Sequence, residues 1–209
     1  MSDRGTGFAE SFSDWAVTQA TGLHEITELT GTAENWLRGQ AILAARRGAF
    51  GPYIDITAET GAGRTDLTLL RDGRPSLRVE LKLLFNNKNL LGRQNGVAAV
   101  AADIEKLKRS VGDECYVAAW CLFRNWHVVP VTRAYCATTS GISLQPPTGE
   151  EDFATFAEQL ARNVLASVGV RAEPRVFAAF DGCWSGLFVQ QVVEPASWQK
   201  YDVGHDARS

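Results

Sequence analysis

Three charged residues lie in two neighbouring strand-like segments of the chain. Asp66 belongs to the run 64–70, and Glu80 and Lys82 belong to the apolar run 77–85. Side chains two residues apart in a strand share a face, so Glu80 and Lys82 point one way and their apolar neighbours point the other. Charges in such a strand are costly to bury unless they are paired or bind a metal ion. The pattern therefore indicates a paired or cation-binding site on the sheet.

The chemistry that these residue types favour is metal-assisted hydrolysis. Two carboxylates that converge from neighbouring strands provide oxygen ligands suited to Mg²⁺ or Mn²⁺. Such an ion would hold a phosphate oxygen and lower the pKa of a bound water. Lys82 would orient the attacking water, help to deprotonate it, or offset the charge that develops on the phosphate. Glu34, in the helix expected before these strands, is a candidate third carboxylate.

The site forms only if Asp66 and Glu80 share a face of the hairpin that joins their strands. Asp72-Gly73 is a strong turn signal between the two runs. A two-residue turn with regular pairing would place Asp66 opposite Val79, on the wrong face, whereas one more residue places it opposite Glu80. The hypothesis therefore predicts an odd-length loop or a bulge in this hairpin.

The elements that must position these residues follow from hydrophobic periodicity and turn signals. The expected helices cover 7–18, 32–48, 96–110 and 150–167, and the expected strands cover 53–60, 64–70, 77–85, 115–123, 126–131, 175–180 and 184–193. The first three strands form an antiparallel meander, and 115–123 is apolar enough to be a central strand covered on both faces. This order predicts a mixed α/β (α+β) fold with helices on the faces of a central sheet.

At this point the sequence resembles the PD-(D/E)xK nuclease superfamily. The matching pieces are Glu34, Asp66 in the stretch GRTD, and the triplet Glu80-Leu81-Lys82. The resemblance implies a restriction-endonuclease-like αβββαβ core over about residues 32–131, within a single domain of residues 1–209. A C-terminal helix and β-hairpin, about 138–200, would elaborate that core. The resemblance also implies that Asp66, Glu80 and Leu81 are metal ligands. The catalytic set that it implies is Asp66, Glu80, Lys82 and Glu34.

The sequence departs from the superfamily pattern at two places. Thr65 stands where a proline usually precedes the aspartate, and Gln94 is followed four residues later by Ala98, so a Gln-x-x-x-Tyr motif is missing. The stretch 103–107 instead resembles a D-x-x-K-L helix seen in some small members. We expect a structural role for that helix.

DNA is the expected substrate, with single-stranded and branched DNA included. Residues 34–109 carry 13 basic and 8 acidic residues, although the whole chain has a net charge of −3. A basic stretch of this kind can bind phosphates. Arg64, Lys88, Arg93 and Gln94 flank the proposed centre and are candidate substrate-binding residues, with ordinary solvated loop positions as the alternative.

A binding protein without catalysis is the rival hypothesis. It would keep the nuclease fold and act as an immunity or assembly subunit, and the acidic net charge and the unassigned last third of the chain favour it. That last third is also where a homodimer or a protein partner would bind. No apolar run approaches the ~20 residues of a membrane span, and the first residues lack the apolar core of a secretory signal, so we expect a cytoplasmic protein without membrane contact.

Overall fold

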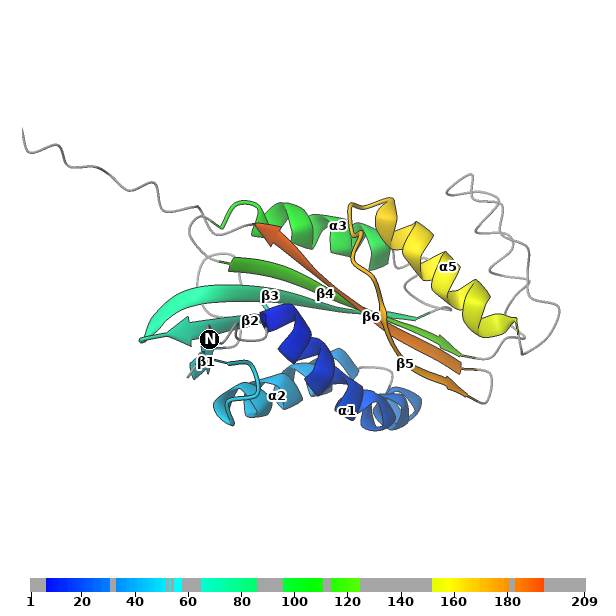
Figure 1. Ribbon diagram of the computed structural model, residues 1–209, viewed down its shortest axis with the longest axis horizontal. Helices are drawn as coiled ribbons and strands as arrows, with labels where there is room; N and C mark the ends of the chain where they lie inside the picture. The colour runs from blue at the N-terminus through cyan, green and yellow to red at the C-terminus, as the bar shows by residue number, and fades with distance from the viewer. Residues whose placement is uncertain are drawn as a thin grey trace, which may run out of the picture.

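A mixed six-stranded sheet is the centre of the computed structural model. The structure describes residues 7–30, 33–51, 53, 55–57, 65–85, 96–110, 114–124, 152–180 and 183–193. Its strands are β1 (Asp55–Thr57), β2 (Leu67–Arg71), β3 (Arg74–Phe85), β4 (Glu114–Arg124), β5 (Arg175–Phe180) and β6 (Cys183–Val193). They lie in the order β1-β2-β3-β4-β6-β5 (Figure 1), and only β3 and β4 run parallel. The expected mixed α/β arrangement with one central sheet is confirmed.

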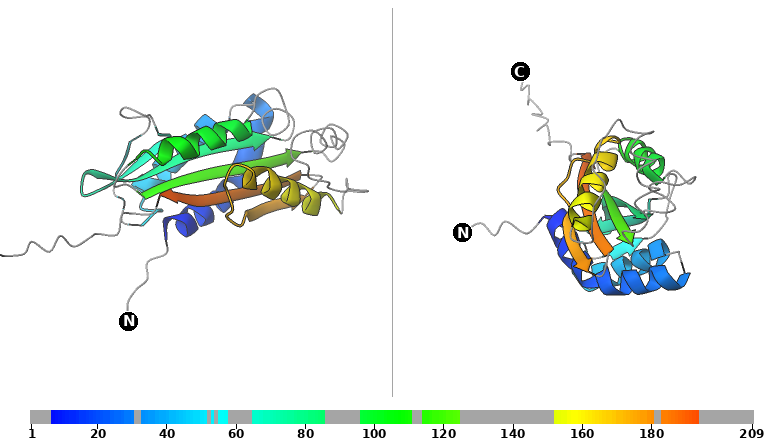
Figure 2. Two further views of the ribbon diagram at one scale, coloured as in Figure 1. Left: turned by 90° about the horizontal axis from the view of Figure 1, so that it is seen from above. Right: turned by 90° about the vertical axis from the view of Figure 1, so that its right-hand side faces the viewer.

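Two pairs of helices cover the two faces of this sheet. The helices α1 (Phe8–Thr30) and α2 (Ala33–Arg46) lie on one face, and α3 (Gly96–Leu107) and α5 (Phe153–Ala166) lie on the other. The end-on view of Figure 2 shows the sheet between the two pairs. The connection from β3 through α3 to β4 is a crossover, because two parallel strands cannot be joined by a tight turn.

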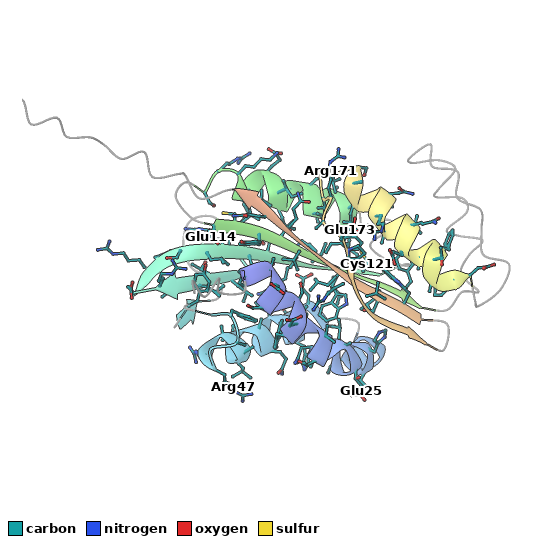
Figure 3. All side chains as sticks on the ribbon, viewed as in Figure 1. Glu25, Arg47, Glu114, Cys121, Arg171 and Glu173 are labelled. Carbon is teal, nitrogen blue, oxygen red and sulfur yellow. The ribbon has the colours of Figure 1, made fainter. Side chains whose placement is uncertain are left out.

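Burial follows the alternation of the strands. Leu81 and Trp120 face the α1–α2 side, whereas Ala119 and Cys121 face the α3–α5 side. Every residue of β4 from 115 to 123 is buried, which confirms the prediction of a central strand covered on both faces. The charged residues Glu25, on α1, and Arg47, directly after α2, are exposed (Figure 3).

The first helix is longer than its sequence pattern predicted, since it continues to Thr30 rather than ending near Thr18. Its buried residues keep helical spacing in the second half, with Ala16, Ala20 and Leu23 packed in the core. Small apolar residues make this stripe inconspicuous in the sequence. The helix α2 ends at Arg46, two residues before the predicted stop at Gly48. Gly48 has a φ of 78° and donates its N–H to the Ala45 carbonyl, which is typical of a left-handed cap.

The hairpin between β2 and β3 contains the predicted irregularity. Asp72 and Gly73 have φ values of 54° and 73°, as a two-residue type I′ turn requires. The pairing then shifts, because Leu70 lies opposite Pro75 and Leu69 lies opposite Leu77. Ser76 is the extra residue between them, a β-bulge on β3. Thr68 therefore pairs with residue 78 and Leu67 with residue 79, so the next pair in register is Asp66 with Glu80. The bulged register that the site hypothesis required is confirmed.

The C-terminal hairpin is part of the same sheet. The strands β5 and β6 are antiparallel, as predicted, and β6 also pairs along β4 from Cys115 to Arg124. This second pairing did not follow from the sequence. Helix α5 begins at Phe153 and packs on β6 with α3 beside it. The expected strand 126–131 and the loop 138–148 lie outside the described residues. Within the described helices, none has the length and apolar character needed to cross a bilayer.

Candidate functional site

The site lies along the part of β3 that β2 does not reach. The register shows pairing of β2 with β3 only as far as Val79, whereas β3 continues to Phe85. Beyond Val79, within the part of the chain that the structure describes, two carboxylates bond to the backbone of β3. Asp66 Oδ2 accepts a hydrogen bond of 2.8 Å from the Leu81 N–H, and the Glu34 carboxylate bonds the backbone of Leu83. A strand edge leaves unpaired N–H groups, and here acidic side chains satisfy them.

Asp66, directly before β2, and Glu80, in β3, are both buried, and each contacts a basic side chain. Asp66 Oδ1 lies 2.9 Å from Arg38 Nη2, which comes from α2. Glu80 Oε1 lies 2.5 Å from Lys106 Nζ, which comes from the last turn of α3. The side chain of Glu80 is only 3% exposed, so the neutralisation of its charge matters for folding.

Lys82 contacts a different pair of carboxylates. Its Nζ lies 3.1 Å from Asp103 Oδ2 on α3 and 4.0 Å from Glu34 Oε1 on α2. Lys82 therefore links the helix on one face of the sheet to the helix on the other. Its ammonium group lies in the same cluster as Asp66, whose charge contributes to raising the pKa of Lys82.

Burial and mutual repulsion control the electrostatics of the cluster. Burial first, and then the charges of Asp66 and Asp103, raise the pKa of Glu80 from 4.5 to about 7, although contact with Lys106 opposes the rise. Burial also raises the pKa of Glu34 and of Asp103. Burial alone would lower the pKa of Lys82, but the Glu34 and Asp103 carboxylates outweigh it and the pKa is raised.

The donors present are compatible with a divalent cation held by two carboxylates. Among the described residues, no group of three or more His, Cys, Asp and Glu side chains is placed to hold a metal ion. Mg²⁺ does not need three, because it keeps several waters and commonly uses one or two carboxylates. The charges of Asp66 and Glu80 are close enough to repel each other and to raise the pKa of Glu80. A cation between them would relieve that repulsion.

The structure brings together four of the residues that the sequence singled out as catalytic. Asp66, Glu80, Lys82 and Glu34 form one cluster, and Leu81 contributes its backbone N–H to Asp66. The candidate substrate-binding residues Arg64, Lys88, Arg93 and Gln94 lie outside the described residues.

Three members of the cluster were missed as site residues. They are Arg38, Asp103 and Lys106. The sequence did hold a signal for the last two, because they lie three residues apart on an otherwise apolar helix face with Val100, Ile104 and Leu107. The helix that we expected to be purely structural therefore contributes an acid and a base to the site.

No protein-family model, no curated protein and no solved structure matches this chain. The function is therefore inferred from the geometry of the cluster.

Proposed function

We propose that this protein is a Mg²⁺-dependent nuclease of the PD-(D/E)xK type that hydrolyses DNA phosphodiester bonds. One observation carries the proposal. The bulge at Ser76 shifts the register, which ends with Leu67 opposite Val79, so the positions that follow it are Asp66 and Glu80, and Lys82 and Glu34 join the same cluster from β3 and α2. This gathering of four residues from three separate segments supports a metal-assisted hydrolase.

The order of the elements supports a restriction-endonuclease-like core. Helix α2 is followed by the antiparallel strands β1, β2 and β3, then by α3 and by β4 parallel to β3. This is the αβββαβ order that the resemblance implies. The hairpin β5–β6 and helix α5 extend that core by adding two strands beside β4.

The proposed mechanism assigns separate tasks to the acidic and basic residues. Asp66 and Glu80 would hold a divalent cation, which when bound polarises a phosphate oxygen and lowers the pKa of water. Lys82 stays protonated at neutral pH, since the pKa of its ammonium group is raised. It therefore acts as a positive charge that orients water and offsets charge on the phosphate rather than as a general base. Asp103 and Glu34 position that ammonium group.

A cleavage panel tests the proposal. Wild-type protein is incubated with single-stranded, duplex and branched DNA in Mg²⁺, in Mn²⁺ and in EDTA, beside Lys82→Ala. We expect metal-dependent cleavage of at least one substrate, and a rate lower by about 100- to 1,000-fold in K82A, because a charge aimed at the transition state is lost. Lys108→Ala is the matched control, since Lys108 is exposed and pairs with Glu105 outside the cluster. Cleavage by K82A at the wild-type rate would contradict the assigned role.

A binding protein of the same fold is the second candidate, and the ion pairs favour it. Asp66, Glu80 and Asp103 each contact a basic side chain, so the cluster is largely neutralised without a metal ion. If this candidate is correct, neither Mg²⁺ nor Mn²⁺ will raise the melting temperature, and no DNA in the panel will be cleaved. Cleavage that requires a divalent cation would exclude it.

A further inference from the structure

Lys106 contacts the more deeply buried of the two proposed metal ligands. Its Nζ lies 2.5 Å from Glu80 Oε1, and its side chain is 33% exposed whereas that of Glu80 is 3% exposed. It lies in the last turn of α3, near the end of the helix. The lysine therefore reaches a buried carboxylate while about a third of its own side chain stays in solvent.

The other two cations of the cluster are held differently. Arg38 contacts Asp66, but its side chain is only 16% exposed. Lys82, at 21%, contacts Asp103 and Glu34 rather than either proposed metal ligand. Lys106 is the most exposed of the three, and an ammonium group on a four-carbon stem is readily rehydrated. It is the cation best placed to leave the cluster without disturbing the sheet.

We propose that Lys106 occupies the cation position at Glu80 in the metal-free protein and that a divalent cation displaces it on binding. This inference rests on the proposed function, because it takes Asp66 and Glu80 as the metal ligands. Two cations beside one buried carboxylate repel each other, whichever oxygen each one uses. Lys106 thus neutralises Glu80 when no metal is bound, and it competes with the metal for that carboxylate. This competition lowers the apparent affinity of the site for the metal ion.

The test is a Mn²⁺ titration of metal-free protein by calorimetry, combined with melting temperatures in EDTA and in Mn²⁺. The variant Lys106→Met removes the competing charge and keeps the apolar stem. We expect it to bind Mn²⁺ about tenfold more tightly than wild type, as the loss of a competing pair worth about 1.4 kcal/mol would give. Its melting temperature should be lower than that of wild type in EDTA, and Mn²⁺ should raise it by more than it raises wild type.

Three further variants keep the test decisive. Lys106→Gln retains a hydrogen-bond donor for Glu80 if the methionine variant does not fold, and it should also bind Mn²⁺ more tightly than wild type. Lys108→Met, two residues along and paired with Glu105, should leave the affinity unchanged. Asp66→Asn should abolish binding in every background.

The outcomes separate the inference from the proposed function. Mn²⁺ binding that depends on Asp66 but is equal or weaker in both Lys106 variants overturns the inference and leaves the metal site intact. Absence of Mn²⁺ binding in wild type and in both variants overturns the metal site and the inference together. Tighter binding in the Lys106 variants alone supports both.

Discussion

Replacing Glu80 with glutamine should remove a pH dependence of folding that its buried carboxyl imposes. Burial, together with the charges of Asp66 and Asp103, raises the pKa of Glu80 from 4.5 to about 7. A raised pKa means that the folded protein holds the proton more tightly than the unfolded chain does. The stability gained in this way is fully present below about pH 4.5 and is lost as the pH rises through about 7.

The magnitude follows from the change in pKa. At 1.36 kcal/mol for each pKa unit, a rise from 4.5 to about 7 corresponds to about 3 kcal/mol of unfolding free energy. Glutamine is uncharged at every pH and does not make this contribution. The unfolding free energy of wild type minus that of E80Q should therefore fall by about 2–3 kcal/mol between about pH 4.5 and pH 8.

Urea unfolding in EDTA, at a series of pH values across that range, measures this difference. Glu105→Gln, on α3, is the control substitution of the same type, because Glu105 is exposed and its contact with Lys108 lowers its pKa. The unfolding free energy of wild type minus that of E105Q should rise with pH, because a lowered pKa stabilises the folded protein at high pH. A wild-type minus E80Q difference that stays constant with pH would refute the reasoning.

Three other predictions concern the core, an exposed helix position and the cluster. Gly186→Ala should cost about 1–3 kcal/mol in urea unfolding, because its new Cβ would overlap the buried ring of Trp184. Gly39→Ala should instead raise the unfolding free energy by about 0.5–1 kcal/mol, because Gly39 lies in a helix and nothing lies within 4 Å of the new Cβ. Asp103→Asn should slow DNA cleavage by about 10- to 100-fold, because Asp103 contacts Lys82 and positions its ammonium group. Equal cleavage rates would show that Lys82 does not need this partner.

Local rules were enough to predict the hairpin that carries the site. Asp72-Gly73 specified a two-residue turn, and the requirement that Asp66 and Glu80 share a face then demanded an extra residue, which is Ser76. Strand alternation alone predicted that Glu80 and Lys82 lie on the same face of the sheet. These features depend on residues that are close together in the chain.

The partners from α2 and α3 could not be predicted in the same way. The contact of Lys106 with Glu80 depends on how the β3–α3–β4 crossover rotates α3 over the sheet, which no local signal fixes. Arg38 reaches Asp66 because β2 stops short of the end of β3, and this too is a tertiary feature. The pairing of β6 with β4 likewise joins segments about 70 residues apart, at a distance where sequence periodicity carries no information.

The central claim is that Asp66 and Glu80 share one divalent cation, and anomalous diffraction from crystals soaked in Mn²⁺ tests it most directly. We predict one strong anomalous peak between the two carboxylates, and its loss in crystals of the Asp66→Asn variant. A peak elsewhere, or no peak at these carboxylates in wild-type crystals, would contradict the account.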